Sequence, residues 1–98
     1  IMIAGILPAE AEIVADILNA YKPEYDFFAY GSRVKGNYSA VSDLDILIKG
    51  EHAVKPEQMQ ELKYKFDESR LPYIVNFTDY HQVEPSFYER IRPDLVKL

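Results

Sequence analysis

The sequence predicts an α/β fold in which helices pack against a short β-sheet. Apolar residues recur at helical spacing in some segments, other short segments are rich in aromatic and β-branched residues, and the two kinds of segment alternate. The 98 residues, of which 48% are hydrophobic and 28% charged, suffice for one apolar core. We therefore expect a single domain over residues 1–98.

Residues 8–21 are predicted as the first helix because apolar side chains recur there on one face. Pro8 suits the first turn of a helix, and Pro23 ends it. The apolar face consists of Ile13, Val14, Ile17, Leu18 and Tyr21. The next segment, residues 25–31, is a short aromatic run ended by Gly31, which indicates a buried strand.

Residues 31–42 have the composition of a loop, with glycines, serines and an asparagine, and leave room for one helical turn. Residues 43–49 form the predicted second strand, acidic at its start and aliphatic beyond. Because side chains alternate along a strand, Leu44 and Ile46 are expected to face the core. Four aromatic side chains are also expected in the interior: Tyr30, Phe66, Tyr73 and Phe77.

The second half of the chain predicts a helix, a strand and a last helix. Pro56 opens the first of these helices, which ends by Leu71. Residues 73–78 are rich in β-branched and aromatic side chains and indicate a third strand. The last helix is predicted from Pro85, or one residue earlier, to a break or cap at Pro93. Its apolar face is expected to comprise Phe87, Tyr88, Ile91 and Leu95.

The composition excludes several classes of site and partner. The chain has no cysteine, which rules out disulfides, thiolate zinc sites and a cysteine nucleophile. His52 and His81 are too far apart for a zinc-binding pair on one helix, and each is expected in an exposed loop. The net charge of −5 repels a phosphate backbone, so we expect no duplex nucleic acid partner. With no apolar stretch near the about 20 residues that span a bilayer, and no signal-peptide pattern, we expect a soluble cytoplasmic protein without membrane contact.

Two acidic residues open the second predicted strand. Asp43 and Asp45 are two positions apart, so their carboxylates share one face of the strand and lie about 6–7 Å apart. Such a pair repels itself without a cation, and carboxylate oxygens suit Mg²⁺ and the neutralisation of phosphate charge. The sequence therefore predicts a metal site at Asp43 and Asp45.

A glycine–serine turn closes the first predicted strand. Gly31 lets a phosphate approach the backbone, and Ser32 adds a hydroxyl donor. If a short helix begins here, the amides of Ser32, Arg33 and Val34 face that phosphate. Arg33 and Lys35 add positive charge, either for phosphate contact or as solvated surface residues.

Residues 28–36 and 42–48 together resemble the signature of the minimal nucleotidyltransferases of the polymerase-β-like superfamily, which is Gly-Ser, a spacer and Asp-x-Asp. The resemblance extends over nearly the whole chain and implies a polymerase-β-like fold with a short mixed sheet. It also implies transfer of AMP from ATP, with Mg²⁺, or Mn²⁺ in its place, bound by Asp43 and Asp45. The positions that match the nucleotide-binding turn of the family are Gly31, Ser32, Arg33 and Lys35.

The resemblance further implies a partner protein. Members of the family are commonly paired with an all-helical HEPN-domain protein in a toxin–antitoxin system, where they act as the antitoxin and adenylylate a hydroxyl of the toxin. Tyr80 and Tyr88 are candidates to anchor such a partner, or a second copy of the chain in a homo-oligomer, with ordinary packing as the alternative. Tyr38, in the motif loop, is a candidate to stack on a base.

The third predicted strand departs from the family pattern. Asn76 stands at the third catalytic position, where the superfamily has an Asp; an amide can offer an oxygen to a metal but cannot accept a proton. Asp79 is the nearest replacement, but three positions along a strand place it about 10 Å away and on the opposite face. Three interpretations therefore remain: an active adenylyltransferase, a degenerate member that neutralises its partner by occlusion, and a nucleotide-sensing subunit without a toxin.

Overall fold

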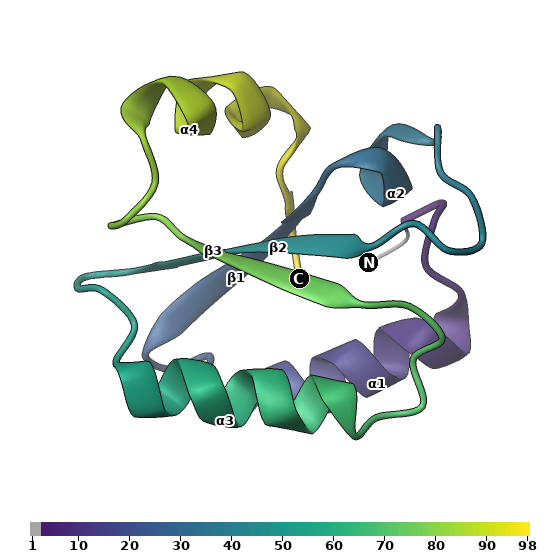
Figure 1. The fold of residues 1–98 in the computed structure, drawn as a ribbon, viewed down its shortest axis with the longest axis horizontal. Coiled ribbons are helices and arrows are strands. Elements are labelled where there is room, and N and C mark those ends of the chain that lie inside the picture. The colour runs from purple at the N-terminus through teal and green to yellow at the C-terminus, as the bar shows by residue number, and fades with distance from the viewer. Residues whose placement is uncertain (1–2) are drawn as a thin grey trace.

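A computed structural model describes residues 3–98, so the first two residues of the expected domain lie outside the described part (Figure 1). A four-stranded mixed sheet, in the order β3-β2-β1-β4, carries helices on both faces. The elements in chain order are α1 (Pro8–Leu18), β1 (Tyr25–Tyr30), α2 (Ser32–Lys35), β2 (Leu44–Gly50), α3 (Pro56–Asp67), β3 (Val75–Asp79), α4 (Pro85–Ile91), a 3₁₀ turn (Arg92–Asp94) and β4 (Val96–Lys97). The α/β class and the mixed sheet expected from the sequence are confirmed.

The sheet register brings the two predicted motifs together. Strand β1 runs antiparallel to β2 and pairs Tyr30 with Asp45, whereas β2 runs parallel to β3 and pairs Asp45 with Asn76. Asp45 therefore has Tyr30 as its neighbour on one side and Asn76 on the other. Gly31, directly after β1, lies at the same end of the sheet.

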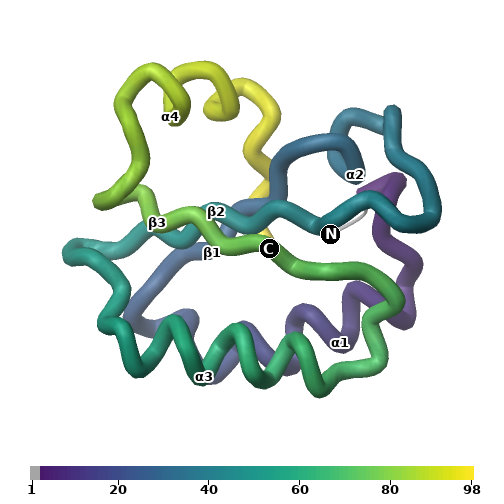
Figure 2. Tube along the Cα trace, viewed as in Figure 1, coloured from purple at the N-terminus to yellow at the C-terminus, as the bar shows by residue number. Residues whose placement is uncertain are grey.

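The larger core lies between the sheet and the pair of helices α1 and α3, which run beneath it and contact each other (Figure 2). Leu44, Ile46 and Ile48 of β2 point into this core, as the alternation of side chains predicts. A smaller apolar cluster on the other face, under α4, is built from Tyr30, Leu47 and Ile91. The start of β2 lies next to α2 rather than under α4 (Figure 1).

Several boundaries differ from the prediction. Helix α1 ends at Leu18 because the chain then turns, with the Tyr21 N–H bonded to Leu18 O, although Tyr21 itself is buried as expected. Helix α3 ends at Asp67, and β3 begins at Val75 rather than at residue 73. Both helices end in hydrogen-bonded turns, since the Tyr21 N–H donates to Leu18 O and the Ser69 N–H to Phe66 O.

The end of the chain contains a strand that the sequence does not predict. Helix α4 stops at Ile91 and Pro93 lies inside the 3₁₀ turn, so Leu95 is not helical, although it packs with the residues under α4. Val96 then pairs with Ala29 of β1, which covers one edge of the sheet. A strand of two residues is too short to produce a periodic pattern. In the described part of the chain, no helix has the length and apolar character needed to cross a membrane.

Candidate active site

Three polar side chains meet where β2 begins. The Asn76 side-chain amide on β3 donates a hydrogen bond to Asp43 Oδ2 at 2.8 Å and another to Asp45 Oδ1 at 3.2 Å. Asp43 directly precedes β2 and Asp45 is its second residue, so the two-residue spacing predicted from the sequence does bring both carboxylates to one amide. Asn76 thus lies at the position expected for the third carboxylate, in register with Asp45.

The surroundings of Asp45 oppose its ionisation. Burial raises the pKa of this carboxyl above its usual value, and the charge of Asp43 raises it further, whereas the hydrogen bond from Asn76 lowers it. The amide hydrogens of Asn76 therefore supply the positive end of a dipole to two carboxylates that would otherwise repel each other.

Gly31 brings the glycine–serine turn against the same carboxylate. Its φ of 85° and ψ of −161° belong to a region that is essentially restricted to glycine. A Cβ atom at this position would collide with Asp45 Oδ2, so the turn and the carboxylate are in direct contact. Helix α2 begins at Ser32 and ends at Lys35, and Gly36, which caps it, has a left-handed backbone conformation with a φ of 92°. The helical turn expected in this loop is confirmed.

The amides of the turn are only partly as expected. The Val34 N–H donates to Gly31 O at 3.1 Å and is engaged within the turn itself. Ser32 is half-buried at the start of α2, next to Gly31, and Lys35 is exposed on the other end of this helix. Ser32 and Lys35 therefore remain the side chains of the turn that can reach a phosphate from solvent.

Arg33 does not have the expected place. Its side chain is buried and its guanidinium donates hydrogen bonds to backbone carbonyl oxygens, including Ser42 O at 2.8 Å and Gly5 O at 2.7 Å. The guanidinium also lies 3.8 Å from the centre of the Tyr73 ring. The expectation that Arg33 contacts phosphate was wrong, because the N–H groups of its guanidinium donate to these carbonyls and its planar face lies against the Tyr73 ring. Sequence reasoning had no signal for this, since the partners are distant in the chain.

Asp79 does not replace the third carboxylate. It pairs with Ile48 at the other end of β2 and is 6% exposed. Its carboxylate accepts hydrogen bonds from the N–H groups of Val54 at 2.7 Å and His81 at 2.9 Å, so it fastens the two loops that meet there. This position agrees with the prediction that Asp79 lies on the face of β3 opposite to Asn76.

Two further side chains line the face that carries the carboxylates. The Tyr30 hydroxyl lies 2.8 Å from Thr78 Oγ1, and the Phe87 ring of α4 meets the Tyr30 ring edge to face. Sequence reasoning did not single out Thr78, although its position two residues after Asn76 on β3 places both on one face. Tyr30, the cross-strand neighbour of Asp45, is itself part of the apolar cluster under α4, so this cluster borders the carboxylates directly.

The donors at this site suit a hard divalent cation. Within residues 3–98, no group of three or more His, Cys, Asp or Glu side chains is arranged to hold a metal ion. Asp43 and Asp45 still provide carboxylate oxygens on one face, and Asn76 can add its carbonyl oxygen when its amide turns. Mg²⁺ and Mn²⁺ prefer such oxygen ligands and usually keep positions for water or phosphate.

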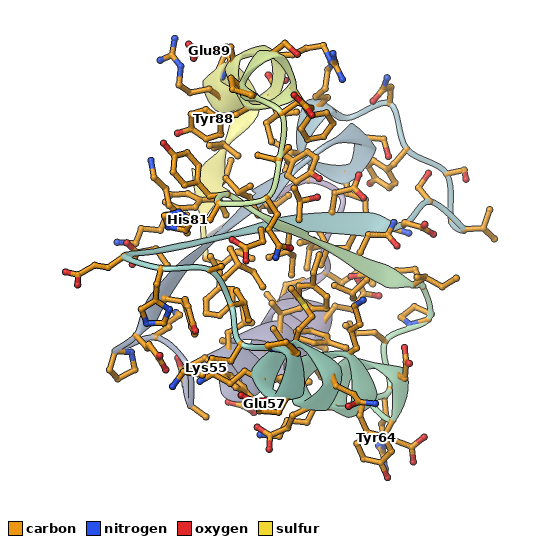
Figure 3. All side chains as sticks on the ribbon, turned by 60° about the vertical axis from the view of Figure 1, so that its left-hand side comes forward. Lys55, Glu57, Tyr64, His81, Tyr88 and Glu89 are labelled. Carbon is orange, nitrogen blue, oxygen red and sulfur yellow. The ribbon has the colours of Figure 1, made fainter. Side chains whose placement is uncertain are left out.

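The remaining candidates lie elsewhere. His52 and His81 are both exposed in loops, as expected. His52 Nε2 lies 3.4 Å from Glu24 Oε2, and His81 Nε2 lies 2.7 Å from Gly50 O. Figure 3 labels His81. The Tyr38 hydroxyl donates to Ala4 O at 3.0 Å, which ties this ring to the N-terminal segment.

Tyr80 and Tyr88 pack against each other. Their rings meet edge to face, with centres 4.9 Å apart. Lys49 Nζ donates to the Tyr88 hydroxyl at 3.1 Å and lies 4.4 Å from the Tyr80 ring centre. Both tyrosines are half-buried; Tyr88 lies on α4, and Tyr80 directly follows β3.

Comparison with known proteins agrees with this geometry. Residues 11–97 match the model of the nucleotidyltransferase domain family. A "Probable protein adenylyltransferase MntA" of Haemophilus influenzae is 40% identical over 83 residues, which are 85% of this chain and 73% of the relative.

Solved structures of low sequence identity share the fold. A crystal structure of a mutant toxin–antitoxin MntA–HpeT complex superposes with a TM-score of 0.72 at 19% identity, over 90% of this chain and 70% of the other. A toxin–antitoxin structure with AMP-PNP gives 0.72 at 18% identity, over 88% and 69%. The resemblance to minimal nucleotidyltransferases is thus confirmed. This chain belongs to the nucleotidyltransferase domain family and is a nucleotidyltransferase.

Proposed function

We propose that this protein is a magnesium-dependent protein adenylyltransferase that transfers AMP from ATP to a hydroxyl of a HEPN-type toxin and thereby acts as its antitoxin. The name of the 40% identical relative supports the protein acceptor. The two similar solved structures, both of toxin–antitoxin assemblies and one with AMP-PNP, support the nucleotide and the partner.

The contact between Gly31 and Asp45 carries the proposal. A turn that lets phosphate approach its backbone lies directly against a carboxylate of the acidic pair, where a side chain would not fit. An acidic patch that only solvates the surface has no need for this contact. Ser32 and Lys35 complete the proposed triphosphate site, and Arg33 is left out of it because of its carbonyl contacts.

The reaction makes one bond and breaks one. The acceptor hydroxyl oxygen bonds to the α-phosphorus of ATP, and the bond from that phosphorus to the bridging oxygen of the β-phosphate breaks, releasing pyrophosphate. The side-chain amide of Asn76 cannot accept the proton of the acceptor hydroxyl, so this proton passes to a carboxylate of the acidic pair or to water. Asp43 and Asp45 would hold Mg²⁺, or Mn²⁺ in its place, and the bound cation would neutralise charge on the phosphates.

Labelling of the partner tests the proposal. Purified HEPN partner, α-labelled ATP and this protein are incubated with Mg²⁺ or Mn²⁺, and we expect labelled partner with wild type and none with Asp45→Ala. Circular dichroism of the variant serves as the folding control. If wild type leaves the partner unlabelled with either cation while Asn76→Asp labels it, the catalytic part of the proposal is wrong.

Asn76 favours one alternative, a member that binds its partner and neutralises it by occlusion. Its amide already joins the two carboxylates by hydrogen bonds, so the site holds together without a cation. A variant with both Asp43→Ala and Asp45→Ala discriminates between the two functions. If the double variant still silences the toxin in cells, occlusion is the function, whereas loss of silencing supports catalysis.

The remaining expectations belong to the same proposal. We infer one nucleotidyltransferase domain over residues 1–98, acting in the cytoplasm, without duplex nucleic acid as a partner. A homo-oligomer is compatible with these functions and is tested by the mass of the protein in solution.

A further inference from the structure

Arg33 is a buried cation whose hydrogen-bond partners are all backbone carbonyl groups. It is 4% exposed, and its guanidinium donates to Ser42 O at 2.8 Å, Ala40 O at 3.0 Å and Ser39 O at 3.3 Å, all in the loop before β2. Ser42, whose carbonyl accepts the shortest of these three bonds, directly precedes Asp43. The backbone that carries Asp43 is therefore attached to α2 by the fork of one side chain.

The loop from residue 37 to residue 41 has no buried side chain of its own. All five residues are exposed, and Val41 is 81% exposed. The hydrogen bonds between Ser39 and Ser42 close a turn within the loop and do not connect it to α2 or to the sheet. The guanidinium of Arg33 supplies the connection to α2.

The same guanidinium connects the loop to the segment that leads into β3. It stacks 3.8 Å from the centre of the Tyr73 ring, and Tyr73 precedes Asn76 by three residues. The Tyr73 hydroxyl in turn donates to Glu10 of α1 at 3.0 Å. Arg33 thus touches the backbone before Asp43 and the ring before Asn76, the two side chains that meet in the site.

The N-terminal segment closes the other side of α2. Gly5 donates its N–H to Arg33 O at 3.0 Å, and the Arg33 side chain donates to Gly5 O at 2.7 Å. A Cβ on Gly5 would lie 2.5 Å from Arg33 O, so the two backbones are in contact. Arg33 is held on both sides and cannot turn toward solvent without breaking these contacts.

We propose that Arg33 is a positioning residue that places Asp43 relative to Asp45 and Asn76, and so sets the affinity of the site for a divalent cation. The planar guanidinium of Arg33 donates to several carbonyls at fixed angles and stacks on a ring, which the single ammonium group of a lysine cannot do. The predicted effect on cation affinity rests on the proposed function, whereas the predicted effect on the order of the loop before Asp43 does not.

The test compares Arg33→Lys with wild type at a temperature well below the melting point of both. We expect Mn²⁺ affinity, measured by electron paramagnetic resonance without nucleotide, to fall by about 10-fold or more, as for other groups that orient metal ligands. We also expect faster amide hydrogen exchange at residues 39–43. Ile48→Val, a conservative change in the large core, is the stability control and should bind Mn²⁺ within about twofold of wild type.

Two outcomes overturn the inference. The first is a folded Arg33→Lys protein with wild-type Mn²⁺ affinity and wild-type exchange at residues 39–43. If Arg33→Lys does not fold, Tyr73→Leu and Tyr73→Phe decide in its place: Leu removes the stacked ring and should weaken Mn²⁺ binding, whereas Phe keeps the ring and should not. If Tyr73→Leu and Tyr73→Phe bind Mn²⁺ with equal affinity, the inference is also overturned.

A failure of the proposed function gives a different result. Wild type that binds no Mn²⁺, or binds it equally well with Asp45→Ala, contradicts the metal site itself. The exchange rates at residues 39–43 in Arg33→Lys then decide the positioning role alone, with faster exchange supporting it and unchanged exchange refuting it.

Discussion

Asn76 sets the charge of the candidate site. With an amide at this position, two carboxylates carry the charge that three would carry in the family pattern, and the amide hydrogens contact both of them. The site can therefore remain assembled without a cation. The folded arrangement of the site should therefore depend less on a bound metal than with three carboxylates, because less negative charge attracts a divalent ion less strongly.

The variant Asn76→Asp should make the stability of the protein depend on metal. In EDTA it loses two hydrogen bonds and gains a like charge, so we expect a melting temperature lower by several degrees, given that about 1 kcal/mol moves the midpoint of such a domain by 4–8 °C. Mg²⁺ or Mn²⁺ should restore the loss and raise the melting temperature more than in wild type. Thermal melts with and without EDTA measure this. An unchanged response to metal would contradict the proximity of these three groups in solution.

Gly31 and Gly36 both have positive φ angles, but only one lies against another group. A Cβ at Gly31 would meet Asp45, whereas a Cβ at Gly36 would meet nothing within 4 Å. We expect Gly31→Ala to cost about 1–3 kcal/mol of backbone strain and to abolish partner labelling. Gly36→Ala should cost about 1–2 kcal/mol and retain labelling. Urea unfolding and the labelling assay measure both, and equal labelling of the two variants would refute the role of Gly31.

Helix α3 presents one buried face to the sheet. Leu62 and Phe66 lie on this face, and the Phe66 ring packs against Phe77 of β3 with centres 5.5 Å apart. Phe77 neighbours Asn76 in the chain, so α3 supports from below the strand that carries the third site residue. The contact between Phe66 and Phe77 therefore stabilises the position of Asn76 as well as the core.

Removal of the Phe66 ring should be costly, and removal of an exposed ring on the same helix should not. Phe66 is 5% exposed and Tyr64 is 65% exposed. We expect Phe66→Ala to lower the free energy of unfolding by about 3–5 kcal/mol through the cavity it leaves. Tyr64→Ala should stay within about 0.5 kcal/mol of wild type. Urea denaturation followed by circular dichroism compares them, and similar losses for both would contradict the orientation of α3.

The molecule as a whole has two unequal apolar layers. The layer between the sheet and helices α1 and α3 includes most of the buried side chains, whereas α4 rests on the small cluster of Tyr30, Leu47 and Ile91. Along β2 the side chain of Asp45 alternates with those of Leu44 and Ile46 in the large layer, so it lies on the same face of the sheet as Leu47 of the small layer. The less stabilised side of the sheet thus borders the site, as regions that must admit ligands often do.

Hydrogen exchange should reveal this asymmetry. We expect the amides of α4 to exchange at least about tenfold faster than the buried turns of α1 and α3, because fewer apolar contacts hold α4 in place. Phe87→Ala removes the ring that meets Tyr30 and should accelerate exchange in α4 while leaving α3 unchanged. Mass spectrometry of exchanged peptides measures both. Exchange of all three helices at one common rate would show a single cooperative unit instead.

Local signals in the sequence predicted helices α1, α3 and α4, strands β1 to β3 and the acidic pair, but not β4. Helical spacing of apolar residues identified α1, α3 and the start of α4, and the alternation along a strand placed Asp43 and Asp45 together. These properties follow from the geometry of a single element, which depends on residues near one another in the chain. Gly31 was identifiable for the same reason, since a glycine between a strand and a basic turn marks a special backbone conformation.

The tertiary structure alone decided the partners of those residues. Arg33 carries the same charge whether it faces phosphate or the carbonyl of Gly5, and only the packing of the N-terminal segment against α2 chooses between them. The pairing of β4 with β1 and the burial of Asp79 likewise depend on segments far apart in sequence. Such contacts leave no periodic trace, because each is made by a few residues whose neighbours are set by the folded chain as a whole.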